Sequence, residues 1–282
     1  RLALEVAEAF VRALWPAAMP AASGRQDSAD APHPDRKETR FSEPLPRSIV
    51  YYRDGFYRYT GAGYDAVADG EMTAEVIRFV QRNGIGKPSL SFTSNVLHNL
   101  KGIAKVPYAL DMPSWLDGRG PAGFALSLAN GILDVREWVD QGCELIPHTP
   151  ELFTVTPLPY RYDRAATCPR WTAFITEIIP DETDRATLME WLGYCLIPSQ
   201  RFQKMMLMTG SGANGKSIVC NVLSALVGEK NCGSQPLENI HEGHNLKPLE
   251  GKLVNFSPEL SRLCPGAEGV VKGITGGDTL TI

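Results

Sequence analysis

The sequence lacks both a long apolar run and a cysteine pair at the spacing of a metal site. No stretch approaches the 18 or more apolar residues of a membrane-spanning helix, so no membrane partner is predicted. The first residues indicate an amphipathic helix rather than an export signal, which predicts a cytoplasmic protein. The six cysteines lie far apart, so neither a zinc cage nor a disulfide framework is expected. We interpret them as reduced thiols, most of them buried.

An excess of basic residues is also missing, because the formal net charge is −4. Residues 200–282 carry eight Lys and Arg against seven Asp and Glu, which leaves twenty against twenty-five upstream. This balance excludes duplex DNA binding through a broad basic face, since that mode depends on many phosphate contacts. A few lysines lining a channel remain compatible with a nucleic-acid strand.

The first part of the chain contains one helix and a linker. With 282 residues, 43% of them hydrophobic, the chain can form about two domains. Apolar residues recur every four positions from Leu2 to Leu14, which predicts a helix over residues 1–15 with one apolar stripe. Residues 16–46 are rich in Pro, Ala and Ser and poor in large apolar side chains, which predicts a disordered linker.

Small β and α elements are expected next. Two aromatic runs flank an Asp-Gly turn signal within residues 49–59 and predict a β-hairpin. Thr73 and Ser94 are each predicted to cap a short helix. A second β-rich stretch is expected over residues 124–135, and residues 146–160 are predicted to be extended with turns, because prolines interrupt them.

The remaining pattern alternates helices with apolar strands. A helix should begin at Pro169 and end at Pro180, and another should follow over residues 181–196. Lys204 to Thr209 is a short apolar run of the kind that is buried on both faces of a parallel sheet.

A glycine-rich motif follows that run directly. Gly210, Gly215, Lys216 and Ser217 meet the pattern GxxxxGK[ST], and a helix is expected from Ser217 to Val227. Such a loop points backbone N–H groups at phosphates, and the positive end of the helix faces the same anion. Lys216 would reach the β and γ phosphates and Ser217 would bind Mg²⁺, so ATP and Mg are the predicted cofactors. The predicted binding loop is Gly210, Ser211, Gly212, Ala213, Asn214, Gly215, Lys216 and Ser217.

Two further residues are candidates for chemistry. Glu259 ends an apolar run that begins at Lys252, and a carboxylate there would hold Mg²⁺ through water and activate the attacking water. Lys272 precedes a Gly276-Gly277 turn and is interpreted as a hairpin lysine that contacts DNA. The non-functional alternatives are that Glu259 is an exposed loop glutamate and that Lys272 is a solvated hairpin lysine.

With these three motifs in this order, the chain resembles the superfamily 3 helicases, specifically the phage and plasmid primase-helicases of the satellite-phage type, with poxvirus relatives. Asn214 before Gly215, the strand ending in Glu259, and Lys272 to Asp278 resemble that family's A, B and B′ motifs. Upstream strings resemble its helicase-associated domain; they are Ala129-Asn130-Gly131-Ile132-Leu133-Asp134, Pro147-His148-Thr149-Pro150, Leu158-Pro159-Tyr160 and Glu190-Trp191-Leu192-Gly193-Tyr194.

The resemblance implies an α/β fold with a P-loop AAA+-like motor domain preceded by a smaller α+β domain. We expect a helix and linker over residues 1–48, the helicase-associated domain over 49–165 and the ATPase domain over 166–282, incomplete at its C-terminus. It also implies ATP-dependent DNA unwinding in replication, a ring that is usually hexameric, single-stranded or forked DNA as partner, an associated primase and a location in the cytoplasm of a bacterial host.

Two departures from the family pattern limit what carries over. The B motif has one acid where relatives often have two, and the sequence ends before the family's sensor asparagine and arginine finger, so this chain alone is expected to hydrolyse ATP poorly. Two other classes remain open: a P-loop kinase, disfavoured because Arg262 is the single arginine after Ser217, and a nucleotide-binding scaffold or loader without turnover.

Overall fold

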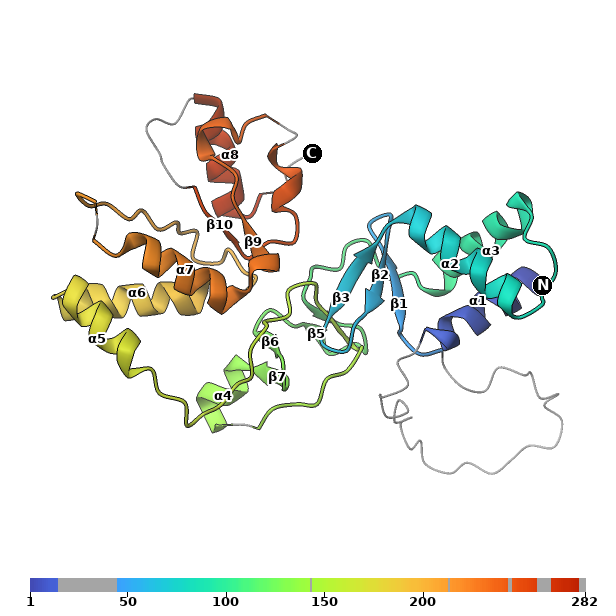
Figure 1. Cartoon of the computed structure of the whole chain (residues 1–282), viewed down its shortest axis with the longest axis horizontal. Coiled ribbons are helices and arrows are strands. Elements are labelled where there is room, and N and C mark those ends of the chain that lie inside the picture. Colours follow the sequence, from blue (N-terminus) through green and yellow to red (C-terminus); the bar gives the residue numbers. More distant parts are fainter. Residues whose placement is uncertain (15–44, 143, 213, 243–244, 258–264, 279–282) are drawn as a thin grey trace. The chain divides into compact units, whose positions relative to one another are not determined.

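The computed structural model describes residues 1–14, 45–142, 144–212, 214–242, 245–257 and 265–278 (Figure 1). It is a mixed α/β protein, as predicted, with two compact units. Unit 1 comprises Arg1–Leu110 and Thr149–Glu151, and unit 2 comprises Asp111–His148 and Leu152–Ile282. The predicted linker falls almost wholly outside the described residues, and the domain boundaries inferred from the sequence stay predictions.

Unit 1 is built on a three-stranded antiparallel sheet in the order β1-β2-β3. The strands are β1 (Ile49–Tyr52), β2 (Gly55–Tyr59) and β3 (Tyr64–Val67). The predicted hairpin is confirmed, since β1 and β2 pair around Arg53 and Asp54, whose φ angles are 43° and 62°. Two successive positive φ angles give a turn whose twist matches that of the flanking strands.

Three helices cover this sheet and share its core. They are α1 (Leu2–Ala13), α2 (Asp69–Arg82) and α3 (Leu90–Ile103). The predicted first helix is confirmed, but its buried face is Val6, Ala7, Phe10 and Val11, while Leu2 is exposed. This face packs with Phe56 of the sheet and with apolar residues of α2 and α3, so α1 belongs to the core of unit 1.

The predicted caps of α2 and α3 were wrong. Thr73 lies inside α2, where its hydroxyl donates to the Asp69 carbonyl at 2.7 Å, and Ser94 lies inside α3. Ser89 caps α3 instead, since its Oγ accepts a hydrogen bond from the Phe92 N–H at 3.2 Å. Each helix starts about one turn earlier than expected. At α2 the acidic residues of the first turn favour this start, because they face the positive end of the helix.

The first half of unit 2 contains short strands. The second β-rich stretch is confirmed as a hairpin of β6 (Ala125–Leu128) and β7 (Gly131–Asp134), followed by α4 (Val135–Gln141). A separate sheet has the order β5-β4-β8, with β4 (Ser114–Trp115), β5 (Gly120–Pro121) and β8 (Leu152–Phe153). Apart from β8, the segment 146–160 forms no strand or helix longer than an isolated bridge, as its prolines predicted.

The second half of unit 2 packs three helices around one apolar cluster. The predicted helices are confirmed as α5 (Pro169–Ile178), α6 (Glu182–Tyr194) and α7 (Lys216–Val227). Pro169 occupies the first turn of α5, and Asp181 caps α6 by accepting a hydrogen bond from the Asp184 N–H at 3.0 Å. Their shared core consists of Ile175, Leu188, Leu192, Cys195, Val219, Leu223 and Val227.

A two-stranded parallel sheet and a last helix complete unit 2. After α7 come η1 (Glu229–Asn231), β9 (Cys232–Gly233), η2 (Leu237–Asn239), η4 (Lys247–Leu249), β10 (Val254–Asn255) and α8 (Pro265–Gly276). β10 pairs with β9 in parallel, which confirms a strand before Glu259, although a shorter one than predicted. The last helix α8 packs against Ile240 and Leu246.

The predicted strand from Lys204 to Thr209 was wrong. These residues form no strand, and Met205, Leu207 and Met208 are exposed rather than buried between helices. An apolar run is buried as a strand only when a neighbouring strand supplies backbone partners. Among the described strands, β9 and β10 pair only with each other. Neither of them therefore supplies backbone partners to residues 204–209.

The expectation that most cysteines are buried is met only in part. Cys195 is buried and Cys220 and Cys232 are half-buried, whereas Cys168 is exposed; all four are free thiols. In the portion of the chain that the structure describes, no helix has the length and hydrophobicity needed to cross a membrane.

Candidate phosphate-binding site

Three glycines shape the loop between residue 209 and α7. Gly210, Gly212 and Gly215 have φ angles of 157°, 94° and 84°, in the region that residues with a Cβ rarely adopt. At Gly210 the place of a Cβ is filled by the side-chain amide of Asn214. Gly215 is the N-cap of α7, so the helix begins at Lys216, as the motif predicted within one residue. The glycines therefore turn the chain directly into the positive end of a helix.

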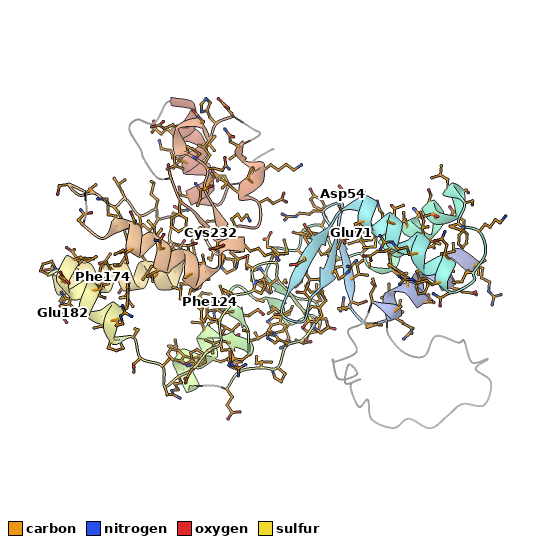
Figure 2. All side chains as sticks on the ribbon, viewed as in Figure 1. Asp54, Glu71, Phe124, Phe174, Glu182 and Cys232 are labelled. Carbon is orange, nitrogen blue, oxygen red and sulfur yellow. The ribbon has the colours of Figure 1, made fainter. Side chains whose placement is uncertain are left out.

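The loop packs against α5 at Gly215. A Cβ placed on Gly215 would lie 2.9 Å from Phe174 Cζ and 2.9 Å from Ile178 Cδ1, which is closer than carbon atoms pack. Figure 2 labels Phe174 on α5, the helix that precedes α6 in the cluster beneath α7. The backbone of the loop thus rests directly on two apolar side chains, and this contact fixes where α7 begins.

Lys216 turns its ammonium group back over the loop. Its Nζ donates hydrogen bonds to the Gly210 carbonyl at 3.2 Å and to Asn214 Oδ1 at 2.7 Å. Both acceptors are neutral, so the positive charge has no carboxylate partner among the described residues. Phosphate oxygens at the same position would make stronger, charge-assisted hydrogen bonds.

A cavity lies in front of these groups. It has a volume of about 390 Å³ and is lined by Gly212, Asn214, Gly215, Lys216, Ser217 and Ile218. Ser217 is exposed in the first turn of α7, and its hydroxyl makes no hydrogen bond within the described residues. A hydroxyl, an ammonium and free helix N–H groups at one opening are the groups that a phosphate and its Mg²⁺ require.

The predicted acid, Glu259, lies outside the described residues. The strand that leads to it is held by side chains that sequence reasoning did not single out. Asn255 of β10 exchanges two hydrogen bonds with the backbone of Gln235, at 2.8 and 2.9 Å, and Ser257 Oγ accepts one from the Leu237 N–H at 3.2 Å. These bonds fix the chain up to two residues before Glu259.

The predicted hairpin around Lys272 was wrong. Lys272 lies in the middle of α8, where its Nζ donates to Glu268 Oε1 at 2.7 Å one turn earlier. Both side chains are exposed, and the lysine hydrogen bond lowers the pKa of Glu268. The structure therefore places Lys272 on a helix surface, and its contact with DNA stays a prediction.

Asn231 is a second residue that sequence reasoning missed. Its side chain is 2% exposed, and Nδ2 donates to the Pro157 carbonyl at 3.0 Å and to the Val227 carbonyl at 2.8 Å. The first of these acceptors lies in the proline-rich segment before α5, and the second lies at the end of α7. The Asn231 side chain therefore links the end of α7 to the segment around Pro157.

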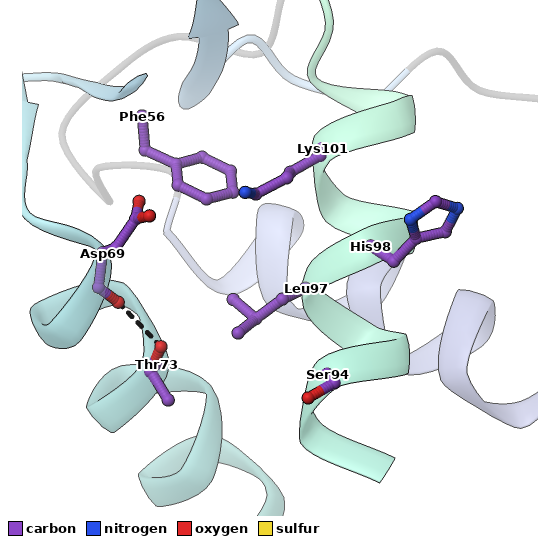
Figure 3. Close-up of a pocket in the computed structure, with 7 residues that line it drawn as sticks. All are labelled: Phe56, Asp69, Thr73, Ser94, Leu97, His98 and Lys101. Carbon is purple, nitrogen blue, oxygen red and sulfur yellow. Dashed lines mark hydrogen bonds between the residues drawn. The ribbon is translucent and has the colours of Figure 1, made fainter. Parts of the chain in front are cut away.

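A second cavity lies in unit 1. It has a volume of about 230 Å³ and is lined by Phe56, Asp69, Thr73, Ser94, Leu97, His98 and Lys101 (Figure 3). Lys101 Nζ lies 5.8 Å from the centre of the Phe56 ring and 5.0 Å from that of Tyr51. None of the predicted site residues lines it.

One family model matches the middle of the chain. The family model described as "D5 N terminal like" matches residues 109–180, which run from the end of unit 1 through α5. This region contains Phe174 and Ile178, the residues beneath the loop, but not the loop itself.

One curated relative extends the likeness. The chain is 24% identical over 233 residues to "Putative helicase L207/L206" of Acanthamoeba polyphaga mimivirus. The alignment covers 72% of this chain and 22% of the relative, so the chain spans about a fifth of that protein. The two matches together support a D5-like primase-helicase family, and they suggest a replication protein of the primase-helicase type.

Proposed function

We propose that this chain is the ATP-binding module of a DNA helicase that acts in replication. The observation that carries the proposal is the arrangement at Lys216: its ammonium is folded over a glycine-shaped loop at the start of α7, and a cavity opens in front of it. The likeness to a D5-type family and to a viral helicase supports the same reading. The proposed motor domain, of the P-loop AAA+ type, comprises residues 166–282.

Each loop residue has a part in holding Mg·ATP. Backbone N–H groups of the glycine-rich loop would bind the phosphates, Lys216 would pair with the β and γ phosphates, and Ser217 would bind the metal ion. Mg²⁺ would neutralise charge that develops on the transferred phosphate. Glu259 would orient and activate the attacking water.

The partners follow from this proposal. We propose single-stranded or forked DNA as the track, self-association into a ring, and a primase domain or subunit acting beside the motor. The relative's name says helicase and nothing of these partners. The site of action proposed is the cytoplasm of a bacterial host.

Titration with a fluorescent ATP analogue tests the nucleotide site. The wild-type chain should bind the analogue in the presence of Mg²⁺, and Lys216→Ala should abolish binding, because it removes the charge that pairs with the phosphates. Lys247→Ala is the matched control, since Lys247 is exposed in η4 and does not line the cavity. Equal binding by wild type and Lys216→Ala would rule out this site.

A different assay separates the helicase from the two other candidate classes. DNA-stimulated phosphate release together with strand separation indicates a helicase. Because this chain alone is expected to hydrolyse ATP poorly, the assay uses a version extended beyond residue 282, in which tight ATP binding without turnover at any DNA concentration indicates a scaffold or loader. Phosphate transfer to a small acceptor, with no response to DNA, indicates a kinase.

A further inference from the structure

Two arginines from distant parts of unit 2 converge on one aromatic ring. The guanidinium carbon of Arg136 lies 4.1 Å from the centre of the Phe124 ring, and that of Arg201 lies 5.7 Å from it. Arg136 belongs to the first turn of α4, and Arg201 lies in the turn that follows α6. Phe124 directly precedes β6 and is labelled in Figure 2. Two positively charged side chains therefore lie against the same aromatic ring.

Neither guanidinium group is neutralised by a carboxylate within the described residues. Asp140 lies one turn after Arg136 on α4, and Glu137 lies beside it, yet neither forms an ion pair with it. Asp134 instead caps α4, where its Oδ1 accepts a hydrogen bond from the backbone N–H of Arg136 at 3.0 Å. Exposed guanidinium groups without a carboxylate partner attract phosphate groups, with which they form charge-assisted hydrogen bonds.

An exposed aromatic ring lies beside the pair. Phe202 is 57% exposed, and the guanidinium carbon of Arg201 lies 5.1 Å from its ring centre. Its other neighbour is Tyr194 at the end of α6, with ring centres 5.2 Å apart and planes at 67°. Tyr194 thus braces Phe202 while leaving much of the ring open to solvent, where it can stack on another flat group.

We propose that Arg136, Arg201 and Phe202 form a binding site for single-stranded DNA, an inference that rests on the proposed helicase function. Guanidinium groups recognise phosphates, and an exposed phenyl ring stacks on any base, so the two together match one strand without regard to sequence. All three side chains are exposed on an open surface, which suits a polymer that continues to either side. Phe124 and Arg136 lie in the region matched by the family model and Arg201 lies beyond it, so the site joins the two parts of unit 2.

Fluorescence anisotropy with a labelled oligothymidine tests the site over a series of salt concentrations. Arg136→Ala and Arg201→Ala should each reduce the slope of log affinity against log salt by about 0.7, and the double variant should lose about twice that. Phe202→Ala should weaken binding by roughly 5- to 150-fold, because one stacked base is lost, while Phe202→Trp should retain it. Excess thymidine monophosphate should not compete.

Matched variants control for charge and for folding. Arg170→Ala removes an exposed arginine of α5 that forms no hydrogen bond or ion pair within the described residues, so it should leave the slope close to that of wild type. Arg136→Lys and Arg201→Lys keep the charge and should keep most of the salt slope. Circular dichroism should show unchanged helix content in every variant that is compared.

The outcomes separate this site from the phosphate loop. If the double arginine variant binds DNA as Arg170→Ala does across the salt series, the inference is overturned. It is also overturned if the wild-type chain binds the ATP analogue but no DNA, a result that leaves the nucleotide site standing. If DNA binding depends on these residues while Lys216→Ala changes nothing in ATP binding, the proposed nucleotide site fails and this site survives.

Discussion

Gly215 lies directly against Phe174, so that a Cβ at residue 215 would come within 2.9 Å of the Phe174 ring carbon Cζ. The glycine belongs to the glycine-rich loop before α7, and the ring belongs to α5, the last helix of the region matched by the D5 family model. Phe174 belongs to the apolar stripe of α5, and the same side chain limits how closely the loop backbone approaches that helix. The position of the loop backbone therefore depends on its packing against α5.

The first prediction tests this contact with Gly215→Ala. The variant should lose roughly 1–3 kcal/mol of stability from its φ of 84°, with more from the contact with Phe174 and Ile178. It should also bind the ATP analogue less tightly, because relief of the clash displaces the loop. Thermal unfolding and analogue titration measure the two effects.

Gly212→Ala is the matched control for this prediction. Its φ of 94° imposes similar backbone strain, but nothing lies within 4 Å of its Cβ position. The difference between the two variants therefore reports the contact with α5. Equal losses in both would show that this contact adds nothing.

The sequence predicted the elements whose signals are local. Pro169 at a first turn, a helix start near Asp181 and a hairpin at the Asp54-Gly55 signal each depend on a few neighbouring residues, and all three were confirmed, although the turn itself is Arg53 and Asp54. The glycine-rich motif of residues 210–217 is local as well, and Gly210, Gly212 and Gly215 have positive φ angles. The start of α7 followed from the motif for the same reason.

What the sequence could not show depends on partners distant in the chain. Burial of Met205 and Leu207 as a strand requires a neighbouring strand, and periodicity does not reveal whether one is present. Lys272 stood before two glycines that signal a turn, yet packing of Val271 beside Ile240 favours a helix there. Asn231 carries no sequence signal for its role, since its acceptor at residue 157 is 74 residues away.

The second prediction concerns Asn231. Replacement by Ala leaves the carbonyls of Pro157 and Val227 without their donor in a buried site, which should cost about 1–3 kcal/mol. Asn231→Asp should cost more, because a carboxylate would face two carbonyl oxygens. Urea unfolding measures both, with Asn221→Ala on the exposed side of α7 as control. A loss in Asn231→Ala no larger than in the control would contradict the link.

The third prediction concerns the Lys272 and Glu268 pair on α8. Lys272→Ala should raise the pKa of Glu268, because the hydrogen bond that lowers it is removed. A lowered pKa in the folded protein stabilises the fold above the unfolded value, and this contribution is lost as the pH falls. NMR titration of the Glu268 carboxyl measures the change. The same variant tests DNA contact, since an unchanged salt slope would leave Lys272 as a surface ion pair only.

The fourth prediction concerns Glu259 in a form of the protein that hydrolyses ATP. Glu259→Gln should retain ATP binding and lose most hydrolysis, because the amide can no longer accept a proton from the attacking water. Glu250→Gln is a suitable control, as Glu250 is exposed just after η4. Analogue titration and single-turnover phosphate release separate binding from chemistry. Normal hydrolysis by Glu259→Gln would place the catalytic acid elsewhere.

The last prediction concerns Cys195, whose pKa is raised to about 12 by burial and, to a lesser extent, by Cys232. The thiolate is the reactive form, so at pH 8 a thiol reagent should label exposed Cys168 quickly and Cys195 only after unfolding. Because the pKa of Cys195 in the folded protein lies above the usual thiol value of 9.0, the contribution to stability is complete below about pH 9 and falls as the pH rises toward 12. Relative to Cys195→Ala, the free energy of unfolding of the wild type should therefore fall by at most about 1.4 kcal/mol per pH unit in that range. Urea midpoints from pH 8.5 to 10.5 measure this difference. Rapid labelling of Cys195 in the folded protein would show that α6 and α7 do not pack around it as the structure has them.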